Sequence, residues 1–169
     1  MSESREWLVQ WLRDAHAMEE QAETMLSGQL SRIENYPELS DRIRLHLDET
    51  RQQAARLKTC LDQMDESSST MKDAGGKLTA MAQSISGVFA GDEVMKGSLA
   101  SYTFEHMEIA SYTILIAAAQ SLGDTEVARV CEENLREEVA MADWLKARLP
   151  STAAQFLRRA ETESDSAKR

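Results

Sequence analysis

Six ionisable side chains fall where a helical sequence would ordinarily place apolar residues. Each lies on a stripe of apolar residues spaced three or four positions apart, which is typical of the buried face of a helix. They are Glu19, His46, Glu49, Glu105, Glu108 and Glu138. Buried carboxylates without partners are costly, and like charges close together force protonation. A pair of divalent cations would remove both difficulties, so the sequence predicts a metal site.

The acids also match in depth along the predicted helices. Glu108 lies about fifteen residues before Gly123 and Glu138 about fifteen after it, so the two face one another if the chain turns back at this glycine. Glu19 and Glu49 lie at similar distances on either side of a turn predicted near Tyr36. One layer of the fold is therefore expected to collect at least four carboxylates.

The elements that must position these acids are four long helices, because only two prolines and seven glycines interrupt the chain. We expect helices over residues 4–34, 37–66, 92–123 and 124–148, with Asp92 as an N-cap and Gly123 as a C-cap. A crossover of about 25–30 residues, with a weaker helical piece at 78–89, joins the two pairs. Pro150 is expected to end the fourth helix, and a short C-terminal helix is predicted at 153–159.

This connectivity predicts an all-α, ferritin-like four-helix bundle of two antiparallel helix pairs. The 169 residues fit one domain, assigned to 1–160, with a polar tail at 161–169. A formal net charge of -10 argues against nucleic-acid and anionic-membrane partners. The N-terminal MSESREWL lacks the features of a leader, so a cytoplasmic protein is expected. Cys60 and Cys131 show no CxxC spacing and are read as buried apolar residues.

Four stretches resemble a known family: WLRDAHAMEEQAE, NYPELSDRIRLHLDET, GSLASYTFEHMEIASYT and EEVAMADWL. They are similar to the bacterial ferritin-like proteins typified by YciE and YciF, with YciE the closer of the two, and the resemblance covers nearly the whole chain. It implies a ferritin-like bundle that pairs as a homodimer, a link to bacterial stress responses, and no firmly assigned reaction.

The resemblance also implies a dinuclear site, built in such bundles from two single glutamates and two Glu-x-x-His motifs. Glu19 and Glu108 match the single acids, and Glu49 and Glu138 match the acids of the paired motifs. Glutamine and methionine replace the motif histidines, at Gln52 and Met141.

Two further residues could complete the predicted ligand set. His46 precedes Glu49 by three residues and could bind from the other side, and Glu105 forms an ExxE pair with Glu108 that resembles rubrerythrin-like sites. A carboxylate-rich set suits iron or manganese. The sequence leaves open whether four more residues belong to the site: His16, Gln52, Tyr112 and Glu137.

The leading functional hypothesis is a metal-dependent redox protein in which two iron or manganese ions deliver electrons to dioxygen or hydrogen peroxide. The rival is a structural or interaction protein on the same bundle with a degenerate or non-redox site, which the missing motif histidines favour. A third reading is an iron-storing cage, which would need many subunits.

Overall fold

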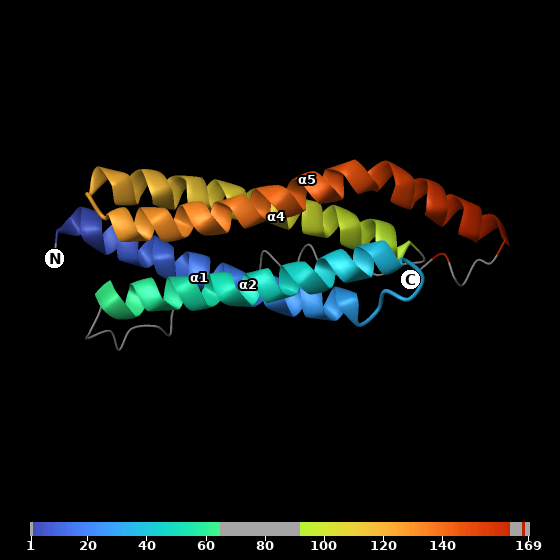
Figure 1. The fold of residues 1–169 in the computed structure, drawn as a ribbon, viewed down its shortest axis with the longest axis horizontal. Helices are drawn as coiled ribbons and strands as arrows, with labels where there is room; N and C mark the ends of the chain where they lie inside the picture. Colours follow the sequence, from blue (N-terminus) through green and yellow to red (C-terminus); the bar gives the residue numbers. More distant parts are fainter. Residues whose placement is uncertain (1, 65–91, 163–166, 168–169) are drawn as a thin grey trace.

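The computed structural model describes residues 2–64, 92–162 and 167, and they form four helices (Figure 1). These are α1 (Glu3–Leu30), α2 (Pro37–Met64), α4 (Glu93–Ser121) and α5 (Thr125–Thr162). No strand occurs in this part of the chain, so the predicted all-α class is confirmed. The predicted helical piece at 78–89, and most of the predicted crossover, lie outside the described residues.

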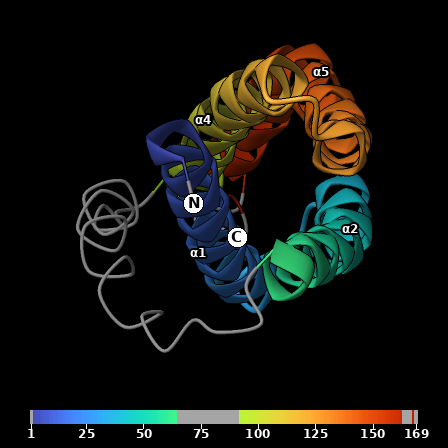
Figure 2. The same ribbon diagram turned by 90° about the vertical axis from the view of Figure 1, so that its left-hand side faces the viewer.

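The helices form two antiparallel pairs, as predicted. α1 turns into α2 within residues 31–36, and α4 turns into α5 within residues 122–124. Figure 2 shows α1, α2, α5 and α4 in this order around a common axis, and each helix contacts its two neighbours. The inner stripes of all four helices therefore face a single core.

The turn between α4 and α5 depends on Gly123. This residue has a φ of 71°, and its N–H donates to the Gln120 carbonyl while the Asp124 N–H donates to the Ala119 carbonyl. This is a Schellman motif, in which glycine adopts the left-handed conformation at no steric cost. The Asp124 side chain then accepts a hydrogen bond from the Val127 N–H at 3.3 Å and caps α5.

Gly123→Ala should therefore destabilise the protein by about 1 kcal/mol, because an alanine is strained in the left-handed region. Gly28→Ala is the matched control. Gly28 lies inside α1, where an added Cβ would meet only the Arg32 side chain at 3.4 Å, and alanine favours a helix interior. Urea unfolding of the two variants should shift the midpoint in opposite directions; equal shifts would contradict the assignment of Gly123.

The prediction that α5 ends before Pro150 is wrong. α5 is a single helix of 38 residues from Thr125 to Thr162 with Pro150 inside it, so no separate helix forms at 153–159 (Figure 1). Proline removes one backbone donor and crowds the preceding turn, which normally bends a helix. Packing compensates here, because Thr152 is buried and Phe156 packs against the cluster that contains Tyr36 and Leu39.

The predicted tail at 161–169 lies mostly outside the described residues. Ala167 is an exception: it is buried, and its carbonyl accepts a hydrogen bond of 2.6 Å from the Tyr36 hydroxyl. The division at residue 160 stays a prediction.

Two apolar clusters fill the bundle on either side of the acids. The first contains Leu12, Leu57 and Leu115 together with both cysteines, and the second contains Ile43 and Leu145. Cys60 and Cys131 are free and buried, and burial raises the pKa of the Cys131 thiol to about 12, as expected for residues that pack rather than react. The polar layer thus lies between two dry regions.

Candidate metal centre

Four predicted site residues meet in the core. His46 on α2, Glu105 and Glu108 on α4, and Glu138 on α5 each offer a ligand atom, and these atoms lie within 4.8 Å of one another. All four side chains are fully buried. We call these four residues the core cluster.

His46 is the cation of the core cluster. Its Nε2 lies 3.1 Å from Glu105 Oε2 and 3.3 Å from Glu138 Oε2, while its Nδ1 lies 2.8 Å from Glu49 Oε2. The Glu49 carboxylate accepts from the Nδ1–H and fixes the ring, so that Nε2 is directed at Glu105 and Glu138; this nitrogen would have to lose its proton to bind a cation. His46 is thus oriented from outside the core cluster.

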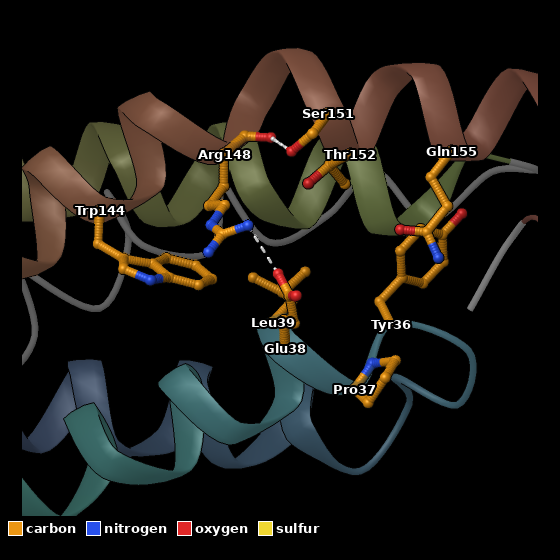
Figure 3. A pocket seen from close by; sticks show the side chains of 9 residues that line it. All are labelled: Tyr36, Pro37, Glu38, Leu39, Trp144, Arg148, Ser151, Thr152 and Gln155. Atoms are coloured by element: carbon orange, nitrogen blue, oxygen red, sulfur yellow. Dashed lines mark hydrogen bonds and ion pairs between the residues drawn. The ribbon is translucent and has the colours of Figure 1, made fainter.

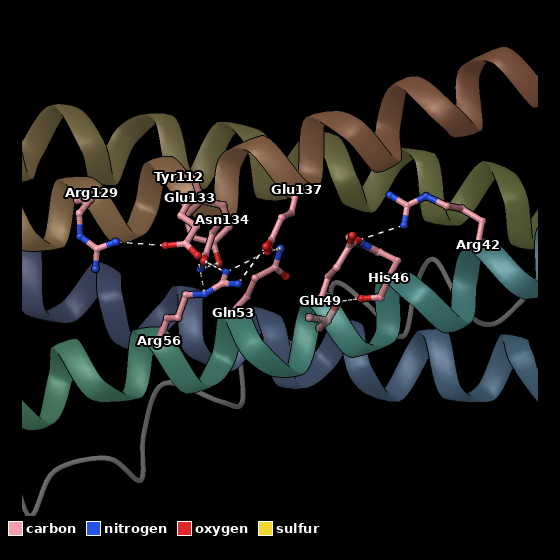
Figure 4. Close-up of polar contacts among 11 residues, drawn as sticks. Arg42, His46, Glu49, Gln53, Arg56, Tyr112, Arg129, Glu133, Asn134 and Glu137 are labelled. Atoms are coloured by element: carbon pink, nitrogen blue, oxygen red, sulfur yellow. Dashed lines mark hydrogen bonds and ion pairs between the residues drawn. The ribbon is translucent and has the colours of Figure 1, made fainter.

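Glu49, predicted as a ligand, lies on the outer side of His46. Its side chain is 23% exposed and also accepts a hydrogen bond of 3.1 Å from Arg42 (Figure 4). Its contacts with Arg42 and His46 outweigh burial and lower the pKa of its carboxyl, so Glu49 carries a negative charge. The structure places Glu49 against the outer side of the His46 ring and does not bring it into the core cluster.

Glu19 reaches the same layer from α1 and is fully buried. Its Oε1 accepts a hydrogen bond from the Tyr112 hydroxyl, and its Oε2 has no hydrogen-bond partner. The oxygens of Glu108 and Glu138 are also buried without a hydrogen-bond partner among the described residues, although Glu138 pairs with His46 at 3.3 Å. Buried acceptors without donors are rare in proteins and often mark the place of an ion.

The electrostatics of the core cluster show how it exists without metal. Burial raises the pKa of Glu105 to about 8 and, together with the charge of Glu138, raises the pKa of Glu108 and Glu19 well above 4.5. Burial disfavours the charged form of His46, but the surrounding carboxylates outweigh it and raise the pKa of His46 well above 6.5. The same pairing lowers the pKa of Glu138 against the effect of burial. The core cluster therefore holds protons, which balance much of the negative charge of its carboxylates.

These pKa shifts predict an unusual pH dependence. Glu105 keeps its proton in the folded state up to about pH 8 but loses it near 4.5 when unfolded, so the folded state binds more protons in this window. His46 acts in the same direction, since its stabilisation is lost as pH rises through its raised pKa. The metal-free protein should therefore lose stability between pH 5.5 and pH 8.

Metal should reverse this trend, because ligands must lose their protons to bind a cation. The increase in melting temperature caused by manganese(II) should grow with pH over the same window. Melting curves with and without chelator at several pH values test both statements. A metal-free protein that becomes more stable towards pH 8 would contradict them.

The residues that the sequence left open lie outside the core cluster. His16 Nδ1 is 3.9 Å from Glu20, and Gln52 is exposed. Glu137 is half-buried and pairs with Arg56 at 2.9 Å, whereas Tyr112 touches Glu19 directly.

Sequence reasoning missed three residues beside the site. Gln53 and Asn134 are fully buried. Gln53 donates directly to Glu137, while Arg56 donates to both Asn134 and Glu137 (Figure 4). Gln53 lies seven residues after His46 and Asn134 four before Glu138, so helical spacing could have found both. Arg56 gave no such signal, since it stands at the edge of the stripe.

A hollow of about 160 Å³ lies apart from this layer, between the start of α2 and the second half of α5 (Figure 3). Arg148 crosses it, with its guanidinium 5.5 Å from the Trp144 ring and 2.7 Å from Glu38. No residue of the core cluster lines the hollow, so it gives no access to that cluster.

The described helices include none with the combination of length and apolar character that a bilayer crossing requires.

A curated protein and several solved structures are similar to this chain over most of its length. YciF of Escherichia coli (strain K12) is 33% identical over 140 residues, which are 78% of this chain and 81% of YciF. A crystal structure from Xanthomonas campestris pv. campestris matches with a TM-score of 0.80 and 45% identity over 95% of this chain and 99% of its own.

Two more solved structures are similar. The crystal structure of the E. coli stress protein YciF matches with a TM-score of 0.71 and 27% identity, covering 88% of this chain and 96% of its own. YcfI of Rhodopseudomonas palustris, described as a candidate structural protein, matches with a TM-score of 0.70 and 27% identity over 86% and 94% of the two chains. The model of the family described as a domain of unknown function, DUF892, matches residues 3–158. The chain therefore belongs to the DUF892 family, which includes relatives of YciF.

Proposed function

We propose that this protein binds two iron or manganese ions in the carboxylate layer and uses them to reduce dioxygen or hydrogen peroxide, in protection against stress in a bacterial cytoplasm. The observation that carries the proposal is the set of buried carboxylate oxygens without donors on Glu108 and Glu138, beside His46. Such a set is costly in an apolar core unless cations occupy it.

The donor set fits the proposed ions. His46, Glu105, Glu108 and Glu138 would hold one ion, and the unpartnered oxygens of Glu19 and Glu108 would contribute to a second. One imidazole among carboxylates suits iron and manganese better than copper or zinc. The chemistry supplied by the bound ions is the transfer of two electrons to the oxidant as they pass from the divalent to the trivalent state.

The chain's own residues prepare the layer for this chemistry. Glu49 holds His46 by its Nδ1 and so presents Nε2 to the interior. The two apolar clusters exclude water above and below the layer. Carboxylates that keep protons in the metal-free state would release them as cations bind, which couples metal uptake to pH.

The experiment that tests this function is anaerobic loading with iron(II), followed by addition of hydrogen peroxide or of air-saturated buffer. The wild type should oxidise the iron much faster than Glu108→Gln, which lacks a central carboxylate. Glu20→Gln, an exposed change on α1, should behave as wild type. Equal rates in wild type and Glu108→Gln would contradict a redox function of this layer.

A structural role on the same bundle is the second candidate. It is favoured by Gln52 and Met141 at the expected histidine positions and by the description of YcfI as a candidate structural protein. That role, with a degenerate or non-redox metal site, predicts that Glu108→Gln leaves the rate of iron oxidation unchanged.

We also propose that the protein acts as a homodimer rather than as a storage cage. The outer face of α4 supports this proposal, because Leu99 and Ile114 are 61% and 55% exposed on a helix whose outward positions carry few charges. Sedimentation should give a particle of dimer mass; a monomer, or a particle of many subunits, would contradict it.

Within the family, we propose that the chain lies nearer to YciE than to YciF. A phylogenetic tree of family sequences that grouped the chain with YciF would contradict this placement.

A further inference from the structure

A series of three hydrogen bonds connects Arg56, near the surface, to the carboxylate layer, and its four residues come from four different helices. Arg56 on α2 donates to Asn134 Oδ1 on α5 at 2.6 Å, and Asn134 Nδ2 donates to the Tyr112 oxygen on α4 at 2.9 Å. The Tyr112 hydroxyl then donates to Glu19 Oε1 on α1. We call these four residues the Arg56 series (Figure 4 shows its first three members).

The direction of every bond in the Arg56 series is set at its outer end. A guanidinium has only donors, so the Asn134 atom that faces Arg56 must be its oxygen. The amide nitrogen of Asn134 therefore faces Tyr112 and donates to the phenol oxygen. Because a phenol has a single hydrogen, that hydrogen is left for Glu19.

Arg56 is itself firmly held. Its Nη2 donates to Glu137 Oε1 at 2.9 Å and its Nη1 donates to Glu137 Oε2 at 3.0 Å. This is a bidentate, charge-assisted hydrogen bond, which is among the stronger polar contacts in proteins. Gln53 donates to the same carboxylate at 2.9 Å, and Glu133 lies 3.4 Å from Arg56 Nε. The side chain of Arg56 is only 20% exposed, so its orientation is not free to change.

The Arg56 series determines which carboxylate oxygen of Glu19 is hydrogen-bonded. Its Oε1 is engaged by Tyr112, and its Oε2 is buried without a partner in the layer that contains Glu108 and Glu138. The geometry points to Arg56 and Asn134 as positioning residues that, through Tyr112, hold Glu19 with Oε2 free for a cation. This inference rests on the proposed function only in treating Glu19 as a ligand.

Asn134→Asp is the sharpest test, since it keeps the shape of the side chain and the contact with Arg56. A carboxylate cannot donate to Tyr112, so the phenol hydrogen gains an alternative acceptor and Glu19 loses its fixed donor. Arg56→Gln removes the outer anchor. Arg51→Gln is the matched control, because Arg51 lies on the same helix but pairs at the surface with Glu23 at 2.7 Å.

The first readout needs no metal. In protein with ¹³C-labelled tyrosine, the Cζ resonance of Tyr112, assigned by its loss in Tyr112→Phe, reports the hydrogen bonds of the phenol. It should shift in Asn134→Asp and in Arg56→Gln and stay unchanged in Arg51→Gln. An unchanged resonance in Asn134→Asp would overturn the inference.

The second readout is manganese(II) affinity by calorimetry. Asn134→Asp should weaken binding about 10- to 100-fold, the range seen for partners of metal ligands. The loss should disappear when Glu19→Gln is already present, because the two changes act on one ligand. A Kd equal to that of wild type, or an equal loss in both backgrounds, would overturn the inference.

The two readouts separate this inference from the proposed function. A wild type that binds no manganese(II) would overturn the function, while the Tyr112 resonance would still support or overturn the orientation set by Arg56.

Discussion

Glu108→Gln should make the metal-free protein more stable and at the same time remove its response to metal. Glu108 is fully buried, and neither of its carboxylate oxygens has a hydrogen-bond partner among the described residues. Burial and the nearby Glu138 and Glu19 raise its pKa well above 4.5, so the folded state resists its ionisation. A neutral amide of the same shape removes that resistance, so the metal-free variant should be more stable than the wild type, and the difference should grow towards pH 8.

Glu108→Gln should also lose most of the stabilisation that metal gives to the wild type. Manganese(II) at 100 times its Kd would stabilise the wild type by about 2.7 kcal/mol, and Glu108→Gln should show almost none of this gain. Melting curves with chelator and with manganese(II) measure both effects, and Glu20→Gln provides the exposed control. With chelator, Glu108→Gln should melt at a higher temperature than the wild type; with manganese(II), the wild type should melt at the higher temperature. The same order in both would contradict a metal role for Glu108.

His46→Gln should produce the largest destabilisation of the metal-free protein. His46 is the buried positive partner of Glu105 and Glu138, at 3.1 and 3.3 Å. Breaking a buried ion pair by removing one member costs about 3–5 kcal/mol, because the other member keeps its charge without compensation. In the proposed site, metal ions would supply positive charge to the same carboxylates, so the cost should be smaller when manganese(II) is present.

Glu49→Gln is the informative comparison for His46. Because Glu49 is partly exposed and contacts the ring from behind, its loss should change stability by less than about 1 kcal/mol. Metal affinity should fall about 10- to 100-fold while the number of ions per chain is kept. Chemical unfolding and calorimetry measure these effects. Complete loss of one ion in Glu49→Gln would instead support the sequence-based assignment of Glu49 as a direct ligand.

The sequence predicted the four helices and the layer of acids because both depend on periodicity. Glu19, Glu105, Glu108 and Glu138 lie on inner stripes at matching depth, and all four are buried in the structure. A helix of known period places side chains on a face with an error of about one position. This error is small enough to predict which acids share a layer. It is too large to predict which of them contact one another within the layer.

The contacts around the layer could not be predicted in the same way. Glu49 and His46 share a stripe, yet Arg42 draws the Glu49 carboxylate outwards and leaves His46 in the core. The Arg56 series depends on the distances between four helices, which periodicity does not give. The continuation of α5 through Pro150 depends on the burial of Thr152, and thus also on tertiary packing.

Elemental analysis would show whether the carboxylate layer binds metal, as proposed. Metal per chain should be measured in protein purified without chelator, for wild type, Glu108→Gln and Glu49→Gln in parallel. We expect one to two iron or manganese ions per chain in the wild type, loss in Glu108→Gln, and retention in Glu49→Gln at saturating metal. Wild-type protein without metal, even after anaerobic reconstitution with iron(II) and manganese(II), would contradict the claim.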